Sequence, residues 1–217
     1  LGFRAIRYCL AHEDIFRIQL RAILRASAYG SIRIMIPLVT EIAEMRRVRA
    51  LTEDIKQELR SEGKAFVENI MLGAMIETPA ACLTADILAD ECDFFSIGTN
   101  DLTQYTMAAD RGNRQVGYLN DVFEPAVLRA IRYIIKCAGD AGIPVGMCGE
   151  AAADPRLTPL LISFGLDEFS VSPSSVLRTR YNISLWTGEK ADKVTAEVMD
   201  MASADDIKAY LTSLQSR

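Results

Sequence analysis

The fold of this chain is decided by residues 70–101, which read IMLGAMIETPAACLTADILADECDFFSIGTND. Residues 70–76 are continuously apolar, as expected of a strand that is buried on both faces. A helix is predicted from Pro79 to about residue 90, and a second strand over 93–97 ends in a polar turn. A strand, a helix and a strand in this order form a right-handed crossover between two parallel strands.

The same alternation extends in both directions from this unit. Towards the N-terminus it predicts strands at 3–7 and 32–39 and helices at 13–28 and 40–60, the second capped by Thr40. Towards the C-terminus it predicts a helix at 125–141, strands at 143–147 and 168–171, and further helices after Asp154 and in the tail. The sequence therefore predicts about six β/α units in one α/β domain spanning residues 1–217.

Two architectures accommodate such units, an open doubly wound sheet and a (β/α)8 TIM barrel. The glycine fingerprint of dinucleotide-binding sheets is absent, which favours the barrel. A complete barrel needs about 250 residues, and the chain begins at Leu1 without an initiator Met. We therefore expect an incomplete barrel from a longer protein, lacking its first two β/α units. Its open edges should be covered by another chain or poorly ordered.

Composition excludes several classes of function. Half of the residues are hydrophobic and the net charge is −5, so electrostatic binding to nucleic acid or to an anionic membrane is not expected. Nor does the sequence contain an apolar stretch long enough to insert into a membrane. The five scattered cysteines and the single histidine, His12, argue against a disulfide framework or a structural zinc site. Free thiols of this kind suggest the cytoplasm.

Reactive side chains gather where predicted strands end. They are Arg4, Glu77, Asn100 with Asp101, and Cys148 with Glu150. In a parallel barrel the carboxyl ends of all strands share one face, and that face carries the active site. We therefore expect these residues to be neighbours in space.

Each of these residues has a chemical interpretation and a plainer structural one. Glu77 and Asp101, on consecutive strands, suit a magnesium ion completed by water and substrate oxygens, or they cap the helices that follow them. Arg4 and Arg111 suit phosphate or carboxylate oxygens, or they are solvated or paired surface arginines. Cys148, between two glycines, is either an open thiol that donates a proton or attacks, or a small buried residue.

Longer motifs add a resemblance to a family. Residues 93–105 (DFFSIGTNDLTQY), continued by 109–113 (ADRGN), resemble the signature of phosphoenolpyruvate-utilising enzymes. The segments at 75–81 (MIETPAA), 146–150 (GMCGE), 1–7 (LGFRAIR) and 21–27 (RAILRAS) are similar to the same family. The forms of these motifs are nearest to the phosphoenolpyruvate–protein phosphotransferases, enzyme I of the bacterial sugar phosphotransferase system. Pyruvate phosphate dikinase and phosphoenolpyruvate synthase carry variant forms.

The resemblance implies a role for each candidate. Glu77 and Asp101 would bind magnesium, and Arg4, Asn100, Asp101 and Arg111 would bind phosphoenolpyruvate. Cys148 would protonate the enolpyruvate leaving group. As a proton donor its thiol must stay neutral, which the nearby charge of Glu150 favours and the cationic magnesium and arginines oppose.

The resemblance also implies what surrounds the chain. The family transfers the phosphoryl group to a histidine on a separate N-terminal domain and then to a phosphocarrier protein, for sugar uptake, and it works as a homodimer in the cytoplasm. Nothing in this sequence matches that histidine motif, and two further arginines of the family's site lie on the first barrel strands. Residues 1–217 alone are therefore expected not to phosphorylate a protein. The remaining alternatives are a magnesium-dependent pyruvate aldolase or lyase and a non-catalytic module for dimerisation or phosphoenolpyruvate sensing.

Overall fold

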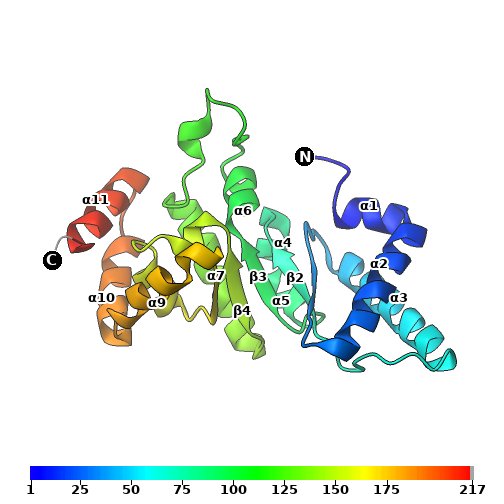
Figure 1. The fold of residues 1–217 in the computed structure, drawn as a ribbon. Coiled ribbons are helices and arrows are strands. Elements are labelled where there is room, and N and C mark those ends of the chain that lie inside the picture. Colours follow the sequence, from blue (N-terminus) through cyan, green and yellow to red (C-terminus); the bar gives the residue numbers. More distant parts are fainter. Residues whose placement is uncertain (216–217) are drawn as a thin grey trace.

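A five-stranded parallel sheet forms the centre of the computed structural model, which describes residues 1–215 (Figure 1). The strands lie side by side in the order in which they occur in the sequence. They are β1 (Ile34–Ile36), β2 (Leu72–Ile76), β3 (Phe95–Gly98), β4 (Val145–Cys148) and β5 (Glu168–Ser170). Every pair of neighbouring strands is parallel. The predicted α/β class and parallel sheet are thus confirmed.

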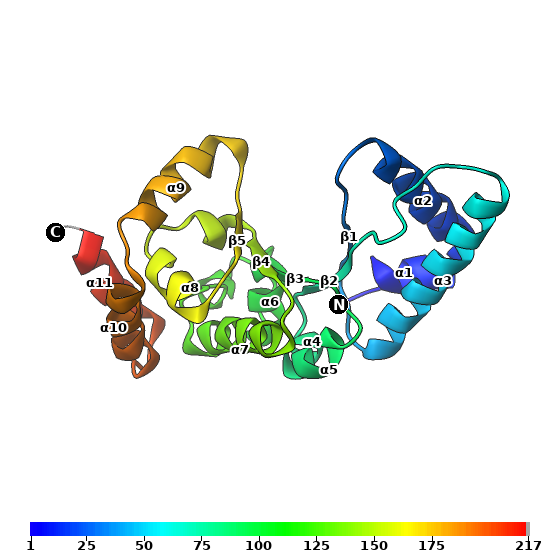
Figure 2. The ribbon, with the colours of Figure 1, turned by 90° about the horizontal axis from the view of Figure 1, so that it is seen from below.

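Helices between the strands cover one face of this curved sheet, as Figure 2 shows. They are α3 (Ile42–Ser61), α4 (Pro79–Leu83), α5 (Ala85–Ala89), α7 (Pro125–Ala141) and α8 (Thr158–Phe164). One apolar core lies between the helices and the strands, and its residues run from Ile6 to Leu211. Strands in sequence order with helices on the outer face have the TIM-barrel-like arrangement that was predicted, as an arc of five consecutive units. That this arc is part of a barrel lacking its first two units stays a prediction.

The remaining elements extend the two ends of the arc. Helices α1 (Ile6–Ala11) and α2 (Glu13–Ala26) and the short helix η1 (Ser27–Tyr29) lie beside α3. At the other end, η4 (Pro173–Ser175), α9 (Val176–Ser184), α10 (Gly188–Met199) and α11 (Ala204–Gln215) follow β5. Above the carboxyl ends of the strands stand α6 (Thr99–Thr106) and a projecting loop that contains η2 (Gly117–Leu119) (Figure 1). The short helix η3 (Glu150–Ala153) follows β4.

Local signals explain where several helices begin and end. Pro125 occupies the first turn of α7, where a proline removes no hydrogen bond, and Gly142 ends this helix with φ of 70°. Ser203 accepts the backbone N–H of Asp206 and so caps the start of α11. For α3 the prediction was wrong, because Glu41 and Glu44 form the capping box, while Thr40 donates its N–H to Glu44 Oε2 at 2.6 Å.

The predicted strand at 3–7 is also wrong. This segment leads into helix α1, in which Ile6 is the buried residue, while Phe3 is 63% exposed. A few apolar residues over so short a segment fit one helical turn as well as a strand. The described residues therefore contain five strands instead of six, and Arg4 does not follow a strand.

Gly73 of β2 provides a test of how closely the sheet packs. A Cβ at this position would lie 2.4 Å from the carbonyl oxygen of Phe94 on the neighbouring chain segment. We expect Gly73→Ala to lower the free energy of unfolding by about 1–3 kcal/mol, because the strands must separate to admit the methyl group. Urea denaturation measures this change.

Gly139 supplies the matched control for this prediction. It is exposed on α7, and a Cβ there meets no atom within 4 Å. Gly139→Ala should leave stability unchanged or raise it by up to about 1 kcal/mol, since alanine favours the helix. Equal effects of the two substitutions would show that the close approach at Gly73 does not limit packing.

Candidate functional site

Three strands deliver polar residues to one small cleft. Ile76 of β2 is paired with Ile97 of β3, and Gly98 of β3 with Cys148 of β4, so the strands end at the same level. The cleft has a volume of about 200 Å³, and it is lined by Met75, Glu77, Gly98, Thr99, Asn100, Asp101, Arg111, Cys148 and Gly149. Of the reactive residues predicted from the sequence, all but Arg4 and Glu150 line this one cavity, and Arg4 contacts Asp101.

Glu77 is buried and held by the loop that follows β1. Its Oε1 accepts the N–H of Leu38 at 2.7 Å, and Leu38 adopts a left-handed φ of 59°. Burial raises the pKa of Glu77, and the charge of Asp101 adds to this effect, while the Leu38 N–H and the charges of Arg4 and Arg111 oppose it. An ionised Glu77 therefore favours a cation beside it.

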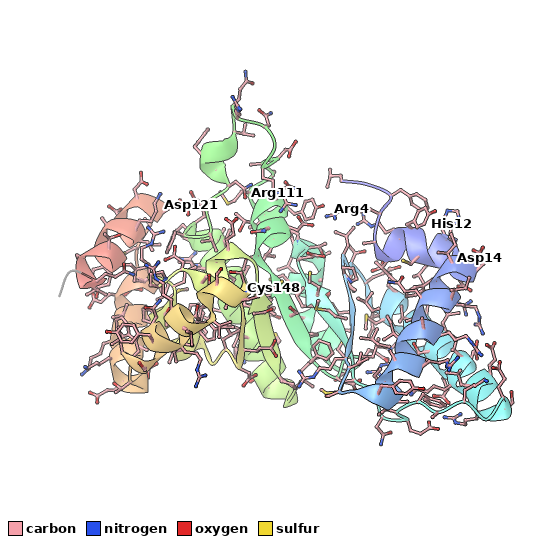
Figure 3. The ribbon with its side chains drawn as sticks, viewed as in Figure 1. Arg4, His12, Asp14, Arg111, Asp121 and Cys148 are labelled. Atoms are coloured by element: carbon pink, nitrogen blue, oxygen red, sulfur yellow. The ribbon has the colours of Figure 1, made fainter. Side chains whose placement is uncertain are left out.

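Asp101 lies in the first turn of α6 and meets two guanidinium groups. Arg4 donates a hydrogen bond to its Oδ2, and Nη2 of Arg111 lies 3.4 Å from its Oδ1. The carboxylate itself is only 8% exposed, whereas each arginine side chain is 52% exposed. Two half-exposed arginines thus converge on one buried carboxylate. In Figure 3 Arg111 is labelled beside α6 and Arg4 between α6 and α1, with Cys148 below them and His12 farther to the right.

Helix capping does not explain either carboxylate. Thr78 caps α4 by accepting the N–H of Ala81 at 3.1 Å. Within residues 1–215, no side chain makes a capping hydrogen bond to α6. Of the two interpretations that the sequence allowed for Glu77 and Asp101, the structural one is therefore wrong.

Cys148 presents a protonated thiol at the edge of the cleft. Its Sγ lies 3.5 Å from the carbonyl oxygen of Ile97, to which the thiol donates. Burial raises the pKa of Cys148, and the charge of Glu77 adds to this effect, against a hydrogen bond from Ser96. The raised pKa keeps the thiol neutral at pH 7, as a proton donor requires. The sequence suggested Glu150 as the carboxylate responsible, but the structure assigns this effect to Glu77.

Gly98 is required by the packing beneath Glu77. A Cβ on Gly98 would lie 2.6 Å from Glu77 Oε2 and 3.0 Å from the sulfur of Met75. Any side chain at this position would displace the carboxylate from the cleft. The turn after β3 therefore needs a glycine at position 98, because there is no room for a Cβ beside Glu77. Thr99 then joins this turn to β4, because its Oγ1 donates to the carbonyl of Cys148 at 3.0 Å.

The carboxylate pair fits magnesium by its chemistry. Magnesium in proteins is commonly held by one or two carboxylates, with water and substrate oxygens completing the octahedron. Glu77 and Asp101 line the same cleft from consecutive strand ends. In the part of the chain that the structure describes, no group of three or more His, Cys, Asp or Glu residues is arranged to hold a metal without a substrate.

Two polar residues of the site received no role from the sequence. Tyr105 accepts a hydrogen bond from Nη2 of Arg4 at 3.1 Å, and Oε1 of Gln104 accepts the N–H of Arg111 at 3.0 Å. The only available signal was helical spacing, since Tyr105 lies four residues after Asp101 and so faces the same side of α6. The backbone N–H of Leu38 was also missed, because its loop gives no such signal.

Comparisons with known proteins identify the family of this chain. Residues 1–186 match the family described as PEP-utilising enzyme, PEP-binding domain. The chain is 46% identical over 211 residues to the phosphoenolpyruvate-protein phosphotransferase of Geobacillus stearothermophilus, covering 97% of this chain and 36% of that protein. It is 44% identical over 211 residues to the protein of the same name from Bacillus subtilis (strain 168), covering 97% of this chain and 37% of that protein. The chain therefore spans little more than a third of the length of these relatives.

A solved structure shows the fold independently. A citrate lyase from Burkholderia xenovorans LB400 superposes with a TM-score of 0.60 at 18% identity, covering 92% of this chain and 68% of that one. At this identity the likeness supports a shared fold and says nothing about activity. The family match over residues 1–186 and the relatives at about 45% identity show more: this chain belongs to the phosphoenolpyruvate-utilising enzymes, as a phosphoenolpyruvate-binding domain of the phosphoenolpyruvate-protein phosphotransferase type.

Proposed function

We propose that this chain binds phosphoenolpyruvate and magnesium within a longer phosphotransferase, which moves the phosphoryl group to a histidine on another domain. The observation that carries the proposal is the convergence of Arg4 and Arg111 on Asp101, in a cleft that also holds Glu77 and the neutral thiol of Cys148. The reaction needs groups that bind phosphate, carboxylates that hold a metal ion, and an acid. Arg4 and Arg111 are called the phosphate clamp.

Each residue has one task in the proposed reaction. The guanidinium groups of Arg4 and Arg111 bind the phosphate, and the amide of Asn100 adds a hydrogen-bonding group beside them. Glu77 and Asp101 would hold magnesium, which supplies charge neutralisation at the phosphoryl oxygens when bound. The P–O bond of phosphoenolpyruvate breaks as a bond from phosphorus to the histidine nitrogen forms. Cys148 then gives its proton to C3 of enolpyruvate, and pyruvate leaves.

The surroundings of the domain belong to the same proposal. The names of the relatives support a protein acceptor, and we infer a histidine domain, a downstream phosphocarrier protein and a role in sugar uptake. A homodimer and a cytoplasmic location are part of this proposal. Among residues 1–215, no helix combines the length and apolar character that crossing a membrane requires.

The first test concerns the phosphate clamp. We expect Arg111→Ala to weaken the binding of phosphoenolpyruvate, measured by titration calorimetry with magnesium present, by about 10–100-fold, since a hydrogen bond to a charged group contributes about 1.5–3 kcal/mol. Arg129→Ala is the matched control, because Arg129 is exposed on α7 and its loss changes the net charge equally. Equal affinities of the two variants would contradict the clamp.

A further inference from the structure

Two residues in the second half of α6, Gln104 and Tyr105, contact the two arginines of the site. Neither of them lines the cleft. Arg4 contacts this helix twice, at Oδ2 of Asp101 and at the hydroxyl of Tyr105, where the Nη2–Oη distance is 3.1 Å. Asp101 and Tyr105 are four residues apart, so their side chains lie one above the other on the same side of the helix. The guanidinium of Arg4 is therefore fixed by two partners on one rigid element.

Gln104 acts on the other arginine through the backbone. Its Oε1 accepts the N–H of Arg111 at 3.0 Å. Arg111 lies in the loop after α6, and no strand or helix of the described chain contains it. The position of its guanidinium therefore depends on where this loop is attached. The hydrogen bond to Gln104 fixes this loop at Arg111 itself, whose guanidinium lies beside Asp101.

We propose that Tyr105 and Gln104 are positioning residues for the two arginines that bind the phosphate of phosphoenolpyruvate. This inference rests on the proposed function. Neither residue lines the cleft of Glu77, Asp101 and Cys148, so each acts through its arginine.

The physical need for such partners follows from the exposure of the arginines. Each arginine side chain is 52% exposed, and a long side chain in solvent loses rotamer entropy when it binds a ligand. Partners that hold it before binding reduce that loss and so increase affinity.

A second need arises at Asp101. Both of its oxygens face guanidinium groups, so a cation or phosphate that enters the cleft competes with these contacts. When Arg4 turns from Asp101 towards a phosphate, the Tyr105 hydroxyl remains as its partner on the protein.

The test uses double-mutant cycles in the intact phosphotransferase. Tyr105→Phe removes the hydroxyl and keeps the ring. We expect it to raise the dissociation constant and the KM for phosphoenolpyruvate by about 3–10-fold and to leave kcat within about twofold. In an Arg4→Ala background, Tyr105→Phe should have no further effect on either constant. Gln104→Met should behave in the same way, with its effect lost in an Arg111→Ala background.

Controls separate positioning from general damage. Tyr29→Phe and Gln57→Met change exposed residues of the same types on η1 and α3, and they should leave all constants at the wild-type value. The positioning role would be overturned if Tyr105→Phe and Gln104→Met left the affinity for phosphoenolpyruvate unchanged. It would also be overturned if each substitution weakened binding as much in its Arg→Ala background as in the wild type. A fall in kcat with a lowered melting temperature would overturn it as well. Absence of phosphoenolpyruvate binding by the unaltered protein would instead overturn the proposed function.

Discussion

Asp101→Asn is expected to lower magnesium-dependent turnover of phosphoenolpyruvate in the intact enzyme by at least about 10²-fold. Removing a residue that only hydrogen-bonds to a metal ligand typically lowers metal affinity or activity by about 10–100-fold. Asp101 is proposed to bind the metal directly, so its loss should cost at least as much. The amide keeps the shape of the side chain but removes the charge that faces Arg4 and Arg111 and that would bind the proposed magnesium ion. The rate of pyruvate release, measured over a range of magnesium concentrations, checks this prediction.

Asp54→Asn is the control for this experiment. Asp54 is an exposed residue of α3, and Nη1 of Arg17 lies 3.7 Å from its Oδ2. Its loss changes the net charge of the protein equally and should leave the rate near the wild-type value, because exposed ion pairs contribute little. A wild-type rate and magnesium dependence in Asp101→Asn would remove Asp101 from the proposed metal site.

Cys148→Ser is expected to lower the release of pyruvate by about 10²–10⁴-fold, the usual contribution of a general acid. Serine keeps roughly the volume of the thiol, but its hydroxyl is a far weaker acid. Transfer of the phosphoryl group can survive this substitution, because that step does not need the proton. In deuterated water the wild-type enzyme should deliver deuterium to one face of C3, and Cys148→Ser should lose this selectivity. Analysis of the methyl group of pyruvate measures both.

Cys9→Ser provides the matched change. Cys9 is partly exposed on α1 and does not line the cleft, so its loss should affect neither rate nor selectivity. If Cys148→Ser delivers deuterium to one face at the wild-type rate, another group is the acid. A covalent adduct trapped on Cys148 during turnover would favour a nucleophile, which the raised pKa of this thiol argues against.

The sequence predicted the parts of the fold that rest on long or strongly marked segments. The apolar run before Glu77 is β2, and α7 spans Pro125–Ala141, the range that the sequence predicted. Short segments without such marks were less predictable. The start of the chain combines Phe3 and Ile6 in a pattern that fits a strand, and only the structure shows that Ile6 is buried by a helix.

The site was predictable to the extent that strand ends determine it. Glu77, Asp101 and Cys148 meet because parallel strands end at one face of the sheet. Contacts that depend on long-range packing left no trace in the sequence. The N–H of Leu38 reaches Glu77 across 39 residues, and the Arg4 guanidinium reaches Tyr105 across 101 residues. No local pattern encodes such distances, because they follow from how the loops lie on the completed sheet.

The sequential order of the strands has a consequence for how the chain folds. Each strand pairs only with its neighbours in sequence, so the sheet can grow one β/α unit at a time as the chain leaves the ribosome. The contact between Arg4 and Asp101 joins residues 97 positions apart and closes a loop over two of these units. Because closing longer loops costs more entropy, we expect this contact to form late in folding. Nascent chains that end after β3, and so lack Asp101, should therefore already resist protease in the sheet.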